Sequence, residues 1–214
     1  MKWHENALTP GCRLSAGKMA KCPWISSFYL AGGTALALVY GHRVSVDLDF
    51  FSYDNPLGFP ERQAMRDSFR QNDIQVDEEK DGTVQALDGK THLSFFRYSY
   101  PLLHPLKTWE GLQIAHPVDI GLMKIGAIIG RGSQKDFFDL FVITKRDVSL
   151  SRLLFLARKK FPETRDLRLQ ACRALVYFAD ADREPLPKLL MPITWPEVKR
   201  YFEKEVRTLS KSLT

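Results

Sequence analysis

The sequence predicts an α+β fold in which a mixed α/β half is followed by a helical half. Short apolar runs separated by glycine and proline turns fill the first half, as expected of strands and short helices. From Asp119 onward the apolar residues recur at helical spacing. Prolines in residues 101–117 indicate a connecting segment between the halves. We therefore expect a mixed α/β domain at 1–117 and a helical domain at 118–214.

A strand, a tight turn and a helix are predicted first. Residues 28–31 form a short apolar run that stops at the glycine pair Gly32-Gly33. Thr34 can then cap a helix of about two turns. Gly41 suits the C-terminal end of this helix, because glycine readily adopts the left-handed conformation found there.

The next segment, from Val44 to Phe50, alternates apolar and polar residues as a half-buried strand does. Its polar face carries Ser45, Asp47 and Asp49. Side chains two positions apart in a strand point the same way, so the two carboxylates should lie side by side. Like charges held this close repel each other, and a divalent cation relieves the repulsion. Asp47 and Asp49 are therefore candidate metal ligands.

The glycine turn is a candidate phosphate site. Backbone N–H groups at a helix N-terminus favour anions, so Gly32, Gly33 and Thr34 could hold phosphates next to the metal. This combination is what metal-assisted nucleotidyl transfer requires. The alternatives are plain turn glycines and a solvated strand face. Leu48 and Phe50 favour a buried strand over the second alternative.

The rest of the first half is predicted as a lead-in, a helix and four further strand segments. The lead-in, residues 1–26, is short and helical or irregular. The hairpin turn is Asp88-Gly89, a dipeptide typical of tight hairpins. The other expected elements are a helix over 61–72, a strand starting at 74, hairpin strands over 84–87 and 91–98, and a short strand near 112–115.

A lysine is embedded in the first helix of the second half. Lys124 lies in the otherwise apolar segment 119–129. Its ammonium group either reaches the rim of the helix or is buried beside an anionic partner, because an unpaired buried charge is costly. Arg131 is seven residues further on and lies on roughly the same helix face, where it could extend the positive lining.

Two aspartates open the following helix. Asp136 either belongs to a Ser133-x-x-Asp136 capping pattern or pairs with Lys124. Asp139 either forms an i,i+4 pair with Lys135 or has another structural role. The helix is apolar nearly all round, so both acids need a cationic partner.

The composition is that of a globular cytoplasmic protein. Hydrophobic residues make up 44% and charged residues 26% of the chain, which excludes extended disorder. The three cysteines show no metal-site spacing and indicate a reducing compartment. No apolar run reaches transmembrane length and no secretory signal is present, so no membrane association is expected.

Positive charge is concentrated at the C-terminal end. Residues 145–214 carry 16 Lys and Arg against 9 Asp and Glu, whereas residues 1–144 carry 15 against 16. The basic segment could guide a nucleic acid by its phosphate charges. Alternatively, clusters such as Arg158-Lys159-Lys160 only solvate helix faces.

Two long blocks of the sequence resemble a known family. The first, FYLAGGTALALVYGHRVSVDLDFF at 28–51, is similar to the core of polymerase-β-type nucleotidyltransferases and, more closely, to the AbiEii-type abortive-infection toxins. The second, DIGLMKIGAIIGRGSQKDFFDLFVI at 119–143, resembles the lysine helix and KDxxDL helix of that family. A weaker similarity lies at 175–182. The blocks extend over most of the chain from about 28 to 200.

The resemblance implies a nucleotidyltransferase-like mixed sheet whose helical domain completes the active site. It implies a catalytic set of Asp47, Asp49, Lys124 and Asp136, with Lys124 also contacting the nucleotide phosphates. Mg²⁺ is the expected cofactor, with Mn²⁺ as the alternative. The implied reaction moves a nucleoside monophosphate from an NTP to an acceptor hydroxyl on RNA, such as a tRNA 3′ end, or on protein. The implied role is a toxin, paired with an antitoxin, in phage defence.

One feature departs from the polymerase-β pattern. Those enzymes usually carry a third carboxylate on a later strand, but no Asp or Glu occurs from Gly89 to Trp109. Asp88, in the hairpin turn, is poorly placed for this role. One alternative is therefore a degenerate nucleotide-binding module that has lost its chemistry. The other is a basic nucleic-acid-binding protein whose function lies in residues 145–214.

Overall fold

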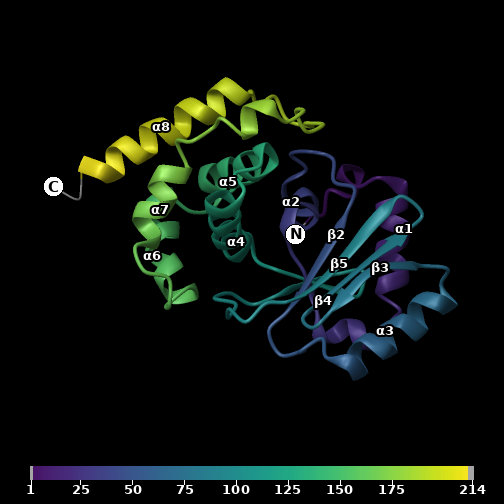
Figure 1. The fold of residues 1–214 in the computed structure, drawn as a ribbon. Helices are drawn as coiled ribbons and strands as arrows, with labels where there is room; N and C mark the ends of the chain where they lie inside the picture. The colour runs from purple at the N-terminus through teal and green to yellow at the C-terminus, as the bar shows by residue number, and fades with distance from the viewer. Residues whose placement is uncertain (1, 212–214) are drawn as a thin grey trace. The chain divides into compact units, whose positions relative to one another are not determined.

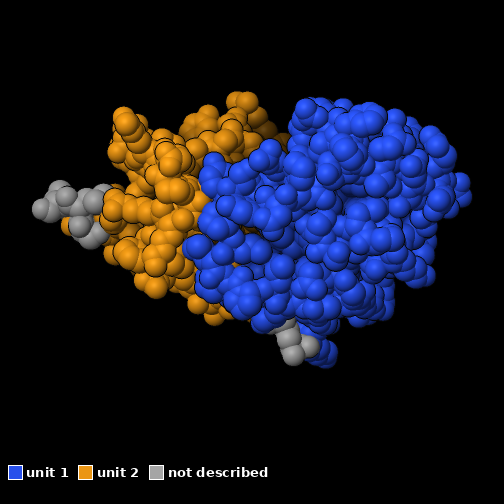
Figure 2. All heavy atoms as spheres, turned by 90° about the horizontal axis from the view of Figure 1, so that it is seen from below, with its two compact units in different colours: residues 1–116 blue, residues 117–214 orange. Residues whose placement is uncertain are grey.

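The computed structural model describes residues 2–211 (Figure 1). The chain divides into two compact units, unit 1 at residues 1–116 and unit 2 at residues 117–214, which Figure 2 colours separately. Unit 1 contains all the strands of the described chain, and unit 2 is helical. The predicted α+β class, with a helical C-terminal region, is confirmed.

Unit 1 is built on a seven-stranded mixed sheet with the order β3-β4-β5-β2-β1-β7-β6. The pairs β2–β5 and β1–β7 are parallel, and the remaining neighbours are antiparallel. The strands are β1 (Tyr29–Leu30), β2 (Leu48–Ser52), β3 (Gln75–Lys80), β4 (Thr83–Asp88), β5 (Thr91–Arg97), β6 (Lys107–Trp109) and β7 (Leu112–Ile114).

One face of this sheet carries the core of unit 1. Aromatic rings with centroids 4.9–6.1 Å apart pack there, and they are Trp24, Phe28, Phe50, Phe69 and Phe95. Phe69 comes from α3, which contacts the edge strand β3. The helical segments of unit 1 are η1 (Glu5–Ala7), α1 (Pro10–Met19), η2 (Pro23–Ser27), α2 (Gly32–Tyr40) and α3 (Phe59–Gln71).

The strand that carries the aspartates is shorter than predicted. β2 begins at Leu48, and Val46 is 47% exposed, so the expectation that Val46 shares the core face was wrong. The reason is a competing partner. The Ser45 N–H donates to Ala7 O at 2.8 Å, which pairs this segment with the lead-in. From Leu48 onward the predicted alternation holds.

The start of α2 also differs from the prediction. The helix begins at Gly32, and Thr34 lies inside it without capping it. The Thr34 hydroxyl is buried and lies 2.7 Å from the Ser45 hydroxyl; it also donates to Asp47 O. At the other end, the prediction for Gly41 is confirmed. This glycine is left-handed, with φ of 62°, and its N–H donates to Ala37 O.

Unit 2 is centred on α4, which contacts α5, α6 and α7. Its close approach to two of these helices depends on Gly121, where an added Cβ would lie 3.2 Å from side-chain atoms of both Ile143 and Leu153. The helices are α4 (Pro117–Gly130), α5 (Gln134–Arg146), α6 (Leu150–Lys160), α7 (Leu167–Ala174), η3 (Ala181–Arg183) and α8 (Trp195–Lys211). Over residues 2–211, no helix combines the length and apolar character needed to span a bilayer.

The cationic cluster Arg158-Lys159-Lys160 is only partly a solvated helix face. Arg158 and Lys159 are exposed, but the Lys160 side chain is fully buried. Its Nζ lies 3.2 Å from Asp119 Oδ1, and Asp119 is fully buried as well. Burial lowers the pKa of Lys160, and the negative charge of Asp119 only partly offsets this effect. Lys160 therefore joins α6 to α4.

Candidate functional site

The glycine turn and a carboxylate meet in unit 1. The Ala31 N–H donates to Asp49 O at 3.0 Å, which places the start of α2 beside β2. Gly32 has φ of +64°, and a Cβ added there would lie 2.7 Å from Asp49 Oδ2. This position therefore requires glycine for two reasons, its left-handed backbone and its contact with the carboxylate.

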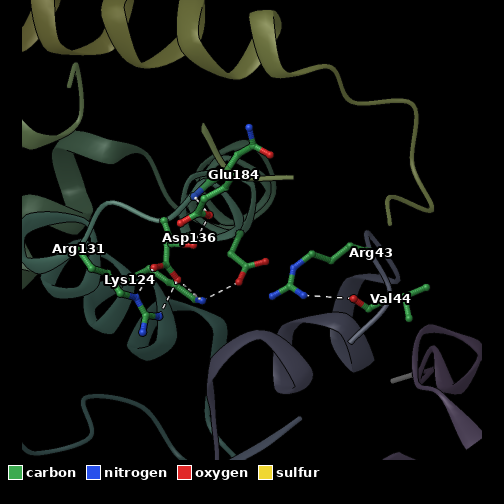
Figure 3. Close-up of polar contacts among 9 residues, drawn as sticks. Arg43, Val44, Lys124, Arg131, Asp136 and Glu184 are labelled. Atoms are coloured by element: carbon green, nitrogen blue, oxygen red, sulfur yellow. Dashed lines mark hydrogen bonds and ion pairs between the residues drawn. The ribbon is translucent and has the colours of Figure 1, made fainter. Parts of the chain in front are cut away.

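A guanidinium group lies at the same turn. A Cβ added at Gly33 would lie only 2.0 Å from Arg43 Nη2. Arg43 is 6% exposed, and its Nη1 donates to Val44 O at 3.2 Å (Figure 3). Sequence reasoning left Arg43 outside the site. The available signal was a cationic residue in the turn between the glycine pair and the aspartates.

Asp47 lies just before β2 and not within it. Its carbonyl oxygen accepts a hydrogen bond from Thr34, and Cys12 Sγ lies 3.9 Å from the same oxygen. Burial and the negative charge of Asp47, with a smaller contribution from Asp49, raise the pKa of the Cys12 thiol to about 12. Both carboxylates therefore contribute to one region of negative potential, which suits a cation.

The strand beside Asp49 offers a hydroxyl and no third acid. In the parallel register of β2 and β5, Asp49 pairs with Ser94. Ser94 of β5 pairs in turn with Gln85 of the next strand, β4. Within residues 2–211, no group of three or more His, Cys, Asp or Glu is arranged to hold a metal ion. A cation held here would have only Asp47 and Asp49 as carboxylate ligands, which fits Mg²⁺, because Mg²⁺ commonly takes its other ligands from water and substrate phosphates.

Unit 2 holds a second polar cluster, centred on Lys124. The Lys124 Nζ lies 2.7 Å from Asp136 Oδ1 and 2.7 Å from Asp139 Oδ2. The predicted pairing of Lys124 with Asp136 is present. Of the two alternatives for Asp139, the i,i+4 pair with Lys135 is not formed, because the Asp139 side chain is buried whereas Lys135 is exposed.

Arg131 completes this cluster at the end of α4. Its Nε lies 3.0 Å from Asp136 Oδ2, and its side chain is 63% exposed (Figure 3). Burial would raise the pKa of Asp136, but the charges and hydrogen bonds of Lys124 and Arg131 outweigh burial and hold the pKa below its ordinary value. Asp136 is therefore ionised at neutral pH, and its charge keeps Lys124 in place.

Glu184 caps the helix that carries Asp136. The Gln134 N–H donates to Glu184 Oε2 at 2.9 Å, and the Ser133 hydroxyl donates to the same oxygen at 2.7 Å (Figure 3). The capping pattern considered for Ser133 and Asp136 is absent, since the Ser133 side chain makes no cap bond to the helix. The carboxylate of Asp136 thus faces Lys124. Sequence reasoning missed Glu184, which no local spacing connects to α5.

The fold and the cluster at the glycine turn define a nucleotidyltransferase-like protein, and comparison with known proteins agrees. Residues 14–107 match the family model described as nucleotidyl transferase AbiEii toxin of a type IV toxin–antitoxin system. An uncharacterized protein of Aquifex aeolicus is 41% identical over 194 residues, which cover 85% of this chain and 87% of that protein. The chain belongs to the AbiEii family of nucleotidyltransferase toxins.

Solved structures share the fold. MenT4, a nucleotidyltransferase toxin of Mycobacterium tuberculosis, superposes with a TM-score of 0.61 at 15% identity, covering 92% of this chain and 82% of that one. A putative nucleotidyltransferase from H. pylori gives 0.50 at 20% identity, covering 98% and 94%. The antibiotic-resistance factor ANT(2'')-Ia gives 0.53 at 12% identity, covering 68% and 88%.

Proposed function

We propose that this protein is a toxin that transfers a nucleoside monophosphate from an NTP to an acceptor hydroxyl. The acceptor oxygen bonds to the α-phosphorus, the bond to pyrophosphate breaks, and the hydroxyl proton passes to solvent. The observation that carries this proposal is the contact between the Gly32 turn and Asp49. It joins a phosphate-binding helix start to a metal-binding carboxylate.

In this proposal Asp47 and Asp49 hold Mg²⁺, with Mn²⁺ as the alternative. The ion would neutralise phosphate charge when bound. Burial raises the pKa of Cys12 most, and the further rise caused by the charges of Asp47 and Asp49 supports cation binding by both carboxylates. Two carboxylates with substrate phosphates are a common Mg²⁺ environment.

The first turn of α2 would hold the phosphates. N–H groups of a first helical turn lack partners within the helix, and the helix dipole adds positive potential. Gly32, Gly33 and Thr34 would contribute backbone N–H groups, since the Thr34 hydroxyl already bonds to Ser45 and Asp47. Arg43 adds a full positive charge at this turn.

Lys124 and Asp136 have distinct roles in the proposal. Lys124 would neutralise charge that grows on the phosphates in the transition state, and Asp136 would either position Lys124 or assist the attacking hydroxyl. The family resemblance supports this part. The buried ion pair at 2.7 Å supports the positioning role, because it restrains a flexible side chain.

The acceptor would be RNA, such as a tRNA 3′ end, or a protein hydroxyl. A cognate antitoxin would neutralise the toxin. A catalytically degenerate nucleotide-binding module is the second candidate. The presence of Ser94 at the position beside Asp49 favours that candidate, because a third carboxylate would strengthen the metal site.

The proposal is tested with the full chain, Mg²⁺, total cellular RNA and each α-labelled NTP in turn. We expect one or more NTPs to label an RNA or protein band. Asp49→Asn should abolish labelling, whereas the matched control Asp54→Asn, at an exposed aspartate just beyond β2, should not. A folded wild-type protein that labels no polymer with any NTP would favour the binding module.

A further inference from the structure

Unit 1 contains a series of aromatic side chains that begins at Phe51, two residues beyond Asp49 on the same strand. We call it the aromatic strip, and it consists of Tyr29 of β1, Phe51 of β2, Phe96 of β5, and Tyr98 and Tyr100 of the segment that follows β5. None of these rings has a role in the site described above. They are not dispersed, because each ring lies within 6.1 Å of another ring of the strip.

The rings form a continuous series. Tyr29 stacks on Phe51 with centroids 6.1 Å apart, and Phe51 lies 5.4 Å from Phe96. Phe51 also meets Tyr98 edge-on at 5.6 Å, and Tyr98 lies 5.1 Å from Tyr100. The series therefore crosses three strands and continues beyond the end of one of them.

The strand register places this strip next to Asp49. Phe51 pairs with Phe96 in the same parallel ladder in which Asp49 pairs with Ser94. Residues two apart in a strand share a face, so Asp49 and Phe51 occupy successive rows on one side of the sheet. The separation along the strand is about 7 Å.

This side of the sheet differs from the core side. Phe50 and Phe95, on the core side, are no more than 1% exposed. Phe51, Phe96 and Tyr98 are half-buried, and Tyr100 is 36% exposed. Tyr29 is only 4% exposed, so the accessible ring surface belongs to Phe51, Phe96, Tyr98 and Tyr100. Accessible rings in a row are the feature on which single-stranded nucleic acids stack successive bases.

We propose that the aromatic strip binds the bases that precede the acceptor hydroxyl of a single-stranded nucleic acid. This inference rests on the proposed function, which places the reacting phosphate at Asp49. An acceptor must bring its hydroxyl to that phosphate, so its preceding bases extend away from Asp49. The base of a single nucleotide needs only one ring. A series of rings that begins in the row next to Asp49 suits the successive bases of a nucleic-acid strand.

Direct binding tests the strip without requiring chemistry. A short fluorescein-labelled single-stranded RNA is titrated with wild-type protein, Phe96→Leu and Tyr100→Leu, and anisotropy gives the Kd. Loss of a base–aromatic stack should weaken binding about 5- to 150-fold per ring. Phe59→Leu is the matched control, because Phe59 is 67% exposed at the start of α3, outside the strip. Its Kd should equal that of wild type.

Three further outcomes are decisive. Unchanged Kd values in strip variants with wild-type melting temperatures would overturn the proposal. If a strip variant binds RNA as wild type does but is no longer stabilised by Mg²⁺–NTP, the strip holds the base of the donor NTP. That result would also overturn the proposal. RNA binding that depends on the strip, in a protein that transfers no nucleotide, would support the strip and refute the proposed function.

Discussion

At the scale of single residues, Gly32 and Asp49 lie so close together that position 32 cannot carry a side chain. The left-handed backbone of Gly32 and the 2.7 Å approach of Asp49 Oδ2 leave no room for a side chain. The sequence indicated both residues, because a glycine pair before a DxD segment is readable. It also offered Arg43 as a cationic residue in the turn between the glycine pair and the aspartates, but it could not show that the fold places this guanidinium against Gly33.

Comparison of Gly32→Ala with a control glycine variant separates the effect of backbone strain from the loss of the phosphate site. We expect Gly32→Ala to destabilise the fold by about 1–2 kcal/mol through its positive φ and to remove the rise in melting temperature caused by Mg²⁺–NTP. Gly89→Ala is the matched control, since Gly89 has φ of +61° and nothing within 4 Å of an added Cβ. A nucleotide-dependent rise retained in Gly32→Ala would place the phosphates elsewhere.

Ser94→Asp tests the reduced metal site. An added carboxylate beside Asp49 should tighten Mn²⁺ binding in the absence of nucleotide, because each acidic ligand strengthens attraction of the ion. Isothermal titration would measure the change against Ser94→Asn, which has the same shape without charge. Equal Mn²⁺ affinity in both variants would show that the ion does not lie between β2 and β5.

Lys124→Ala tests whether the lysine acts on the reaction. Loss of one transition-state charge contact commonly reduces turnover about 10²- to 10³-fold, whereas nucleotide affinity should change little. Lys124→Arg should restore activity only in part. Growth arrest on expression should disappear with turnover, and the exposed control Lys135→Ala should remain toxic. A folded Lys124→Ala protein as toxic as wild type contradicts a catalytic role.

At the scale of elements, the sequence located most helices and strands, including the helix α3 and the hairpin of β4 and β5. It misplaced the start of β2, because alternation cannot show that Ser45 pairs with the lead-in. It also missed Glu184 as the cap of α5, since that contact joins residues about 50 positions apart. Contacts of this kind depend on tertiary structure and leave no local pattern.

The buried pair of Lys160 and Asp119 gives an element-level prediction. Lys160→Met should destabilise the protein by about 3–5 kcal/mol, because the fully buried Asp119 carboxylate loses its cationic partner Lys160. The double variant Asp119→Leu/Lys160→Met should recover most of this loss. Urea unfolding measures both, with exposed Lys159→Met as the control. A Lys160→Met protein as stable as wild type would contradict the buried pairing of α4 and α6.

At the scale of the whole molecule, the chain carries a formal net charge of +6, concentrated in residues 145–214. The structure limits how this charge can act on RNA. Lys160 is committed to Asp119, so the cluster at the end of α6 offers Arg158 and Lys159 to a phosphate backbone. Such charge would strengthen RNA binding without sequence preference, whereas the aromatic strip would contact bases.

The most direct test of the central claim compares label transferred with pyrophosphate released. Wild-type protein, Mg²⁺, the labelled NTP and its acceptor are incubated, and both products are counted over time. Nucleotidyl transfer predicts equal amounts of incorporated nucleotide and pyrophosphate, with both absent in Asp49→Asn and normal in Asp54→Asn. Release of inorganic phosphate instead, or equal transfer by wild type and Asp49→Asn, would contradict the account.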